Sequence, residues 1–442
     1  MRKILIILSL FFVLFSFFPS FFEISQRGKL PEGRVFTLEH NYLFDYNFYL
    51  SRIREGSEGR WMVTEKYYNQ PHASSLFQII YLLFGKIGSV LGLSPDRIYH
   101  AARLILGFLF LITIGWYAQS IFAGRWQIVA FLLIITAGSW PILMKVGEGW
   151  RFGTYMGWWS VIDSLQRITF IPHVLLGQIF LLLFVWKLSP GKSKSLRLLI
   201  WGGVGLVVGI VFPPTIIVIY TIFGVLSVLE FSLAGSHLAR LEWFRKRVVP
   251  RLIFIFLSLP SLIYLKLMFR VMPWSALALF DIQHRMPLPY KEYALALGPM
   301  LPLGIAGLLM VIFKKEKKLF PVISWVLAIG ILFFIFERVP TQSPLRFTEA
   351  AIHIPLGILA AYLFSSLWQH KLKLNNKSML SLSFVIKIGI GTVITATIFM
   401  GIGVMLSMTL WLTDQVRGRR EGTWLVPIGA QILYPLRDFM DG

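Results

Sequence analysis

The chain has no cysteine and few charged residues for its length. Of its 442 residues only 14% are Asp, Glu, Lys or Arg, whereas 56% are hydrophobic, and the mean hydropathy is +0.70. The absence of cysteine excludes disulfides, thiolate metal sites and catalytic thiols. The scarcity of charge excludes an ordinary soluble domain, in which about 25% of residues are charged. The sequence therefore predicts a polytopic membrane protein.

Acidic residues are about half as common as basic ones. The chain has 21 Asp and Glu against 43 Lys and Arg, which gives a formal net charge of +22. In a soluble protein this balance would suggest a nucleic-acid partner. Here the basic residues cluster in short loops between apolar runs, which is typical of cytoplasmic loops. We therefore expect no binding of nucleic acid.

The first apolar run, residues 4–22, follows Arg2 and Lys3 and is long enough to span a bilayer. This pattern predicts a cytoplasmic N-terminus. A cleaved signal peptide is the alternative, but no small-residue cleavage site follows the run, which favours an uncleaved anchor. The apolar stretch 75–93 is interpreted as a juxtamembrane segment. Counting it as a span would place the basic stretch 187–197 outside the membrane, against the distribution of the later basic loops.

With this choice, the fold class is an all-α polytopic membrane protein of about eleven transmembrane helices. The predicted spans are residues 4–22, 99–121, 127–144, 170–186, 198–212, 215–229, 252–267, 301–313, 320–336, 350–367 and 383–412. They form one transmembrane domain, residues 1–412, whose first external loop with juxtamembrane helices is 23–98. A short tail, 413–442, ends outside. Of the 21 carboxylates, 18 fall on the outer face, which favours a carboxylate-bearing site there.

The polar stretch 39–65 is the leading candidate for a catalytic loop. Asp45 precedes a helical pattern in which Tyr46, Tyr49, Leu50 and Ile53 share one face, while Asn47, Ser51, Arg52 and Arg54 are expected to face away. Such a helix lies along a membrane surface. Trp61 follows it as an interfacial ring. Asp45, or alternatively Glu39, can act as a general base. The same stretch is also explained as an ordered cap on a helix bundle.

Two further outer segments carry candidate binding residues. The loop 145–169 holds Glu148, Asp163 and Arg167 with several tryptophans, which either stack on sugars or anchor at the interface. Its carboxylates could join Asp45 on a divalent cation, although no spacing specifies this. Arg346 opens a late span, where a guanidinium can clamp a lipid phosphate through two hydrogen bonds. Snorkelling to the interface is the alternative.

These features resemble the GT-C superfamily of membrane glycosyltransferases. The resemblance rests on FDYNFYLSRIREGSEGRW (44–61), on SPDRIYHAAR (94–103), and on Arg346 and Phe347 followed by IPLGILAA, and it covers roughly residues 1–370. It implies an enzyme of a bacterial-type plasma membrane that moves a sugar from a polyprenyl-phosphate donor to a lipid, glycan or protein acceptor on the outer face, with inversion.

Carried over from the family, the base would be Asp45, and Arg346 would contact the phosphate. Tyr49, Trp61, Arg167, Asp163 and Glu148 are further candidates for substrate binding. Asp45 is followed by a tyrosine rather than by a second carboxylate, which leaves open both a metal ion and the division of roles between Asp45 and Glu39. A transporter of lipid-linked sugars and a non-catalytic membrane scaffold are the competing classes. A transporter usually shows internal repeats and polar groups at mid-membrane, and neither is evident in this sequence.

Overall fold

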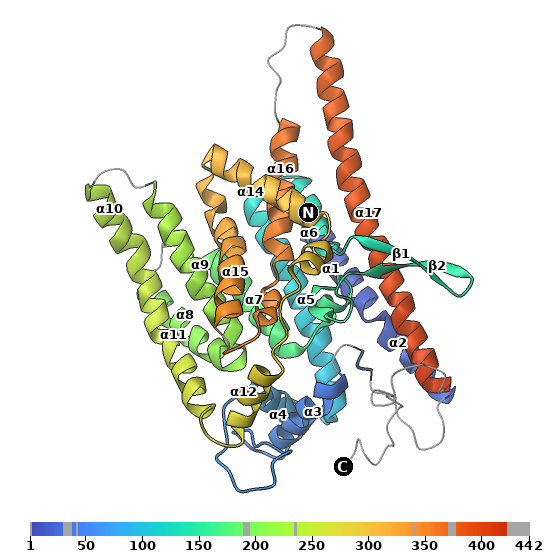
Figure 1. Ribbon diagram of the computed structural model, residues 1–442, viewed down its shortest axis with the longest axis vertical. Helices are drawn as coiled ribbons and strands as arrows, with labels where there is room; N and C mark the ends of the chain where they lie inside the picture. Colours follow the sequence, from blue (N-terminus) through green and yellow to red (C-terminus); the bar gives the residue numbers. More distant parts are fainter. Residues whose placement is uncertain are drawn as a thin grey trace.

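The computed structural model describes residues 2–29, 38–40, 43–188, 195–233, 237–339, 341–369 and 377–421. The described chain is a bundle of long helices with one β-hairpin at its side (Figure 1). The helices are α1 (Arg2–Ser16), α2 (Phe18–Ser25), α3 (Leu43–Ser57), α4 (Ile80–Leu91), α5 (Pro95–Ile121), α6 (Trp126–Ile135), α7 (Pro172–Lys187), α8 (Ser195–Val211), α9 (Pro213–Phe231), α10 (His237–Trp243), α11 (Val249–Met268), α12 (Trp274–Gln283), α13 (Tyr290–Ala296), α14 (Met300–Lys314), α15 (Phe320–Arg338), α16 (His353–Gln369) and α17 (Lys377–Glu421). Shorter helical turns are η1 (Arg27–Lys29), η2 (Ser160–Ile162), η3 (Gln166–Thr169), η4 (Phe244–Val248), η5 (Lys317–Leu319) and η6 (Pro344–Ala350).

The helical membrane-protein architecture predicted from hydropathy is confirmed, whereas the count of eleven spans stays a prediction. Within the described ranges, five helices are long and apolar enough to cross a bilayer, or up to eight if each of three bent pairs is one span. The other three predicted spans correspond to the shorter apolar helices α6, α7 and α8. Proline begins several of the helices, as at Pro95, Pro172 and Pro213, because its fixed φ suits the first helical turn.

One predicted span, 127–144, is wrong in extent. Helix α6 ends at Ile135, and the chain then forms an antiparallel hairpin of β1 (Pro141–Val146) and β2 (Gly149–Thr154). The two-residue turn between the strands begins at Gly147, whose φ of +60° a glycine adopts without strain. The hairpin packs on α17, where the Ser407 hydroxyl accepts from the Phe152 N–H at 2.9 Å. This short sheet is the exception to the all-α prediction.

Several segments predicted to lie outside the membrane gather at one end of the bundle, whereas the β1–β2 hairpin lies at its side (Figure 1). In Figure 1, α3, α4 and α12 lie together at one end and α10 lies at the other. At the first end, Trp274 Nε1 donates to the Ala73 carbonyl at 3.0 Å. At the second, Lys318 Nζ donates to the Ile121 carbonyl at 3.1 Å, so two loops predicted to be cytoplasmic touch. The loops that carry most of the predicted site residues therefore share one end.

Helices α3 and α4 pack together closely, and this contact positions the predicted catalytic loop. A Cβ on Gly85 would lie 1.9 Å from the Ile53 carbonyl oxygen, and one on Gly56 would lie 2.1 Å from that of Leu82. Only glycine allows the two backbones to approach so closely. The N-terminal turn of α3, with Asp45, is thus held on a rigid helical pair.

Candidate functional site

Asp45 lies in the first turn of α3 with its side chain on an accessible side of the helix. A carboxylate at this position is favoured by the partial positive charge of the helix N-terminus. Further along the helix, Tyr46, Tyr49 and Ile53 are buried, which confirms the predicted apolar face. The helix therefore presents Asp45 outward while its aromatic face packs into the bundle.

The prediction that Arg52 faces away from the protein is wrong. Its side chain is 1% exposed, lies 3.6 Å over the Phe48 ring, and donates to the Gln78 side chain. Glu65 lies 3.8 Å from a second guanidinium nitrogen. The segment after α3 folds back over this side of the helix, a contact that the periodicity of α3 alone does not show. This segment therefore covers the side of α3 that carries Arg52.

Arg346 lies in η6, which Ser343 caps by accepting the Leu345 N–H at 3.3 Å. Arg346 Nη2 is 3.4 Å from Asp281 Oδ1, and Nη1 is 3.7 Å from Glu349 Oε1. The guanidinium also acts electrostatically on Asp45. The fold thus brings α3, α12 and η6 together at one site, joining the two residues assigned to base and phosphate contact.

The electrostatic environment of Asp45 suits proton acceptance. Surrounding protein atoms remove part of the water from the Asp45 carboxyl and so raise its pKa, although the residue remains accessible to solvent. The Arg346 guanidinium opposes this rise. A hydrogen bond from Tyr49 and the charge of Arg52 also lower this pKa, while Asp281 raises it. A carboxylate with a raised pKa is a better base than one in water, provided that it stays ionised.

Tyr49 orients Asp45 rather than offering its ring to a ligand. The ring is 5% exposed and stacks on Tyr81, with centroids 4.7 Å apart. The Tyr81 hydroxyl in turn contacts His173 Nδ1 at 2.8 Å. Because one helical turn separates Tyr49 from Asp45, its hydroxyl reaches the carboxylate along the same helix.

Glu39, the second candidate base, is enclosed in an ion pair. Its side chain is 1% exposed, and Oε2 is 3.0 Å from Arg103 Nη1. Arg103 also donates to the Thr169 carbonyl at 2.8 Å. These contacts tie Glu39 to α5 and, through Arg103, to η3, which is the arrangement of a structural anchor.

The side chains of Asp163 and Arg167 both form hydrogen bonds with backbone groups. Asp163 Oδ1 accepts from the Leu165 and Gln166 N–H groups at 3.0 and 2.9 Å. Arg167 Nη2 donates to three carbonyls at the C-terminal end of α6, those of Ile134, Ile135 and Ala137, at 3.1, 3.0 and 2.7 Å. Arg167 thus holds the chain where α6 gives way to the hairpin, and Asp163 holds the turn that leads to Arg167.

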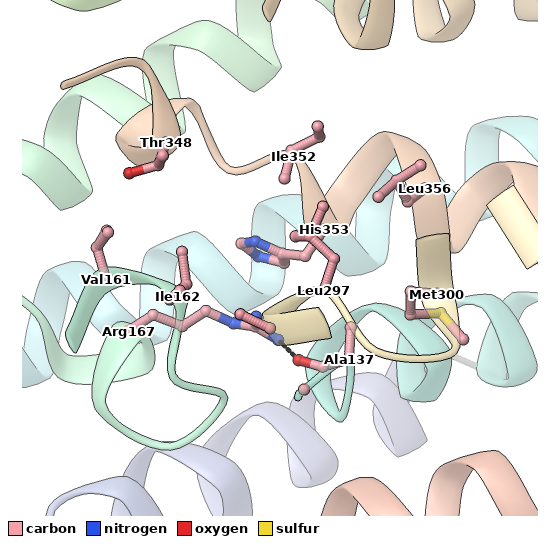
Figure 2. A pocket seen from close by; sticks show the side chains of 12 residues that line it. Ala137, Val161, Ile162, Arg167, Leu297, Met300, Thr348, Ile352, His353 and Leu356 are labelled. Carbon is pink, nitrogen blue, oxygen red and sulfur yellow. Dashed lines mark hydrogen bonds between the residues drawn. The ribbon is translucent and has the colours of Figure 1, made fainter. Parts of the chain in front are cut away.

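Arg167 also lines a small buried cavity together with His353 and Thr348 (Figure 2). Its volume of about 10 Å³ leaves room for about one water molecule. A sugar or a lipid phosphate does not fit such a space.

The remaining two candidates lie at the surface. Trp61 is 65% exposed, and the Lys86 ammonium lies 4.0 Å from its ring centroid. Glu148 occupies the exposed turn between β1 and β2. Of the eight predicted site residues, the structure joins Asp45, Tyr49 and Arg346, and it engages Glu39, Asp163 and Arg167 in other contacts.

A divalent cation would need several carboxylate or imidazole ligands around one point. In the part of the chain that the structure describes, no three His, Asp or Glu side chains gather in this way. Arg346 supplies the positive charge near Asp45, and backbone N–H groups occupy Asp163. These residues do not fit the cation considered from the sequence, and we assign no step to one.

Asp281 is the site residue whose position the sequence does not reveal. It lies 65 residues before Arg346, in a segment with no motif, so only the fold pairs the two. The one available signal is its place in a segment predicted to be an external loop, which also holds Gln283, His284 and Arg285.

Proteins similar to this chain are found by comparison of structures and not by comparison of sequences. No protein-family model matches the chain, and no curated protein matches its sequence. The apo structure of the Archaeoglobus fulgidus oligosaccharyltransferase matches with a TM-score of 0.52 and 13% identity, covering 96% of this chain and 60% of that chain. The chain has a GT-C-type fold.

A second structure of that oligosaccharyltransferase, tethered to an acceptor peptide with the NVT sequon, gives a TM-score of 0.52 at 14% identity, over 96% of this chain and 59% of that one. ArnT from Cupriavidus metallidurans bound to undecaprenyl phosphate gives 0.48 at 13% identity, over 97% and 84% of the two chains. The chain described here thus spans about three-fifths of the archaeal enzyme's length. At 13–14% identity the likeness to the archaeal enzyme concerns the fold alone.

Proposed function

We propose that this protein is a membrane glycosyltransferase that moves a sugar from a polyprenyl-phosphate-linked donor to an acceptor at the outer face. The observation that supports it is the meeting of Asp45 and Arg346 at one end of a GT-C-type fold. A carboxylate poised to accept a proton thus lies beside a guanidinium able to receive a phosphate. The orientation proposed with it places the N-terminus in the cytoplasm and the C-terminus outside.

In the proposed reaction, the acceptor's nucleophilic atom forms a bond to the anomeric carbon as the bond from that carbon to the phosphate oxygen breaks. The acceptor proton passes to Asp45. The bonding electron pair leaves with the phosphate oxygen, and its growing negative charge faces Arg346. The products are a glycosylated acceptor and the polyprenyl phosphate. Attack on the face opposite the phosphate inverts the anomeric centre.

The geometry around Arg346 favours phosphate binding over simple interfacial anchoring. The guanidinium is 41% exposed, and its two terminal nitrogens point to different carboxylates rather than to one bidentate partner. An incoming phosphate offers the paired oxygens that match the planar guanidinium.

Titration of undecaprenyl phosphate into the purified protein tests this contact. We expect the wild type to bind, Arg346→Lys to bind more weakly because it keeps the charge without the planar fork, and Arg346→Ala to lose binding. Arg346→Lys should hardly change thermal stability, whereas Arg346→Ala leaves the buried Glu349 carboxyl without this cation and should lower it somewhat. Equal affinities in all three proteins would make Arg346 an interfacial anchor and would contradict the proposal.

A further inference from the structure

Two carboxylates of very different exposure hold Arg346. Glu349, which contacts Nη1 at 3.7 Å, has a side chain 5% exposed and belongs to the same turn η6. Asp281, which contacts Nη2 at 3.4 Å, is 36% exposed and comes from α12. One side of the guanidinium therefore has a fixed internal partner, whereas the other has a partner that solvent and ligands can reach.

More than one carboxylate shares the single charge of this guanidinium, and among them Glu349 is the one whose pKa burial raises to about 7. Arg346 pairs with Asp281 and Glu349 and also acts on Asp45, and Asp281 and Asp45 interact unfavourably with each other. A lipid phosphate is itself an anion, so it cannot join the Nη2 side of Arg346 while Asp281 stays there without added repulsion. Binding of phosphate at this point requires exchange with Asp281.

The packing of α12 allows such an exchange. Trp274, at its start, is 1% exposed and is tied to the Ala73 carbonyl. Just beyond its end, Arg285 donates to the Glu337 carbonyl at 2.7 Å. Between these anchors the helix is lightly covered, as the 59% exposure of Phe280 shows. Asp281 can therefore turn away from Arg346 while both anchors remain in place.

We infer that Asp281 is a displaceable counter-ion that occupies the outer side of Arg346 until the phosphate of a lipid donor or product takes its place. This inference deepens the proposed function and rests on it. A half-exposed ion pair stabilises little, so the exchange costs little. By competing for Arg346, Asp281 weakens the hold of the site on lipid phosphate and promotes release of the polyprenyl phosphate product.

The experiment is a titration of undecaprenyl phosphate into the full chain in nanodiscs of uncharged-headgroup phospholipid. The variants are Asp281→Asn and, as a matched control, Glu292→Gln, which removes the same charge from an exposed position on the neighbouring α13. We expect Asp281→Asn to bind about two- to five-fold more tightly than the wild type, the size of effect seen for exposed ion pairs. Glu292→Gln should bind like the wild type.

The same comparison in an Arg346→Gln background separates exchange from general repulsion. Arg346→Gln, like Arg346→Ala, is expected to lose most of its binding, and if Asp281 acts by occupying Arg346, adding Asp281→Asn recovers none of it. Tightening of equal size there, or unchanged or weaker binding by Asp281→Asn alone, overturns the inference while leaving the proposed function standing. A wild type that does not bind undecaprenyl phosphate overturns both.

Discussion

Replacing Glu39 by Gln distinguishes an anchoring role from a catalytic one at the second candidate base. The substitution keeps the shape of the side chain but leaves the Arg103 guanidinium, 3.0 Å away, facing an uncharged amide in a buried site. Removing one partner of a buried ion pair costs about 3–5 kcal/mol. Arg103 keeps its hydrogen bond to the Thr169 carbonyl, so we expect a value near the lower end, about 3 kcal/mol.

The assay is thermal denaturation of the purified protein in detergent. A loss of this size lowers Tm by roughly 5 °C or more, whereas Asp45→Asn, at an accessible position, should leave Tm within about 1–2 °C of the wild type. The double variant Glu39→Gln with Arg103→Gln should recover part of the loss, since no buried charge remains. A Glu39→Gln protein with wild-type Tm and no sugar transfer would refute this reasoning and make Glu39 the base.

Three further outcomes follow from the geometry. Because Asp281 raises the pKa of Asp45 and the base must be ionised, transfer is lost as pH falls through that pKa, and Asp281→Asn should move the acid limb of the pH–rate profile to lower pH. Gly85→Ala, whose Cβ would lie 1.9 Å from a carbonyl oxygen of α3, should destabilise the protein by about 1–3 kcal/mol or prevent its accumulation, whereas Gly224→Ala, with nothing within 4 Å, should be tolerated. A topology reporter fused after Lys317 should give a cytoplasmic signal, and an external signal would contradict the proposed orientation.

The sequence predicts the membrane architecture well because long apolar runs are rare outside membrane-spanning helices. Every predicted span overlaps a helix, and the apolar face of α3 is buried as its periodicity indicates. The extent of the span at 127–144 is wrong because hydropathy does not separate a helix from a short apolar strand. The local sequence signal for the turn is Gly147 followed by Glu148 and Gly149, and hydropathy does not register it.

The site was predictable only in part. Asp45 and Arg346 stand out as charges beside apolar segments, and the fold brings them to one end of the bundle. The burial of Arg52 and the pairing of Asp281 with Arg346 depend on contacts between segments far apart in the sequence. No pattern within a single helix contains that information, because side-chain periodicity identifies a face but not what covers it.

The most direct test of the central claim is mass spectrometry of envelope glycans from cells that lack this protein and are supplied with either the wild type or Asp45→Asn. If Asp45 is the base of a glycosyltransferase, deletion removes a sugar from an envelope glycan, lipid or protein. The wild type restores that sugar, and Asp45→Asn, inserted in the membrane at the same level, restores about 1% of it or less at early times. Full restoration by Asp45→Asn at the wild-type rate would contradict the account.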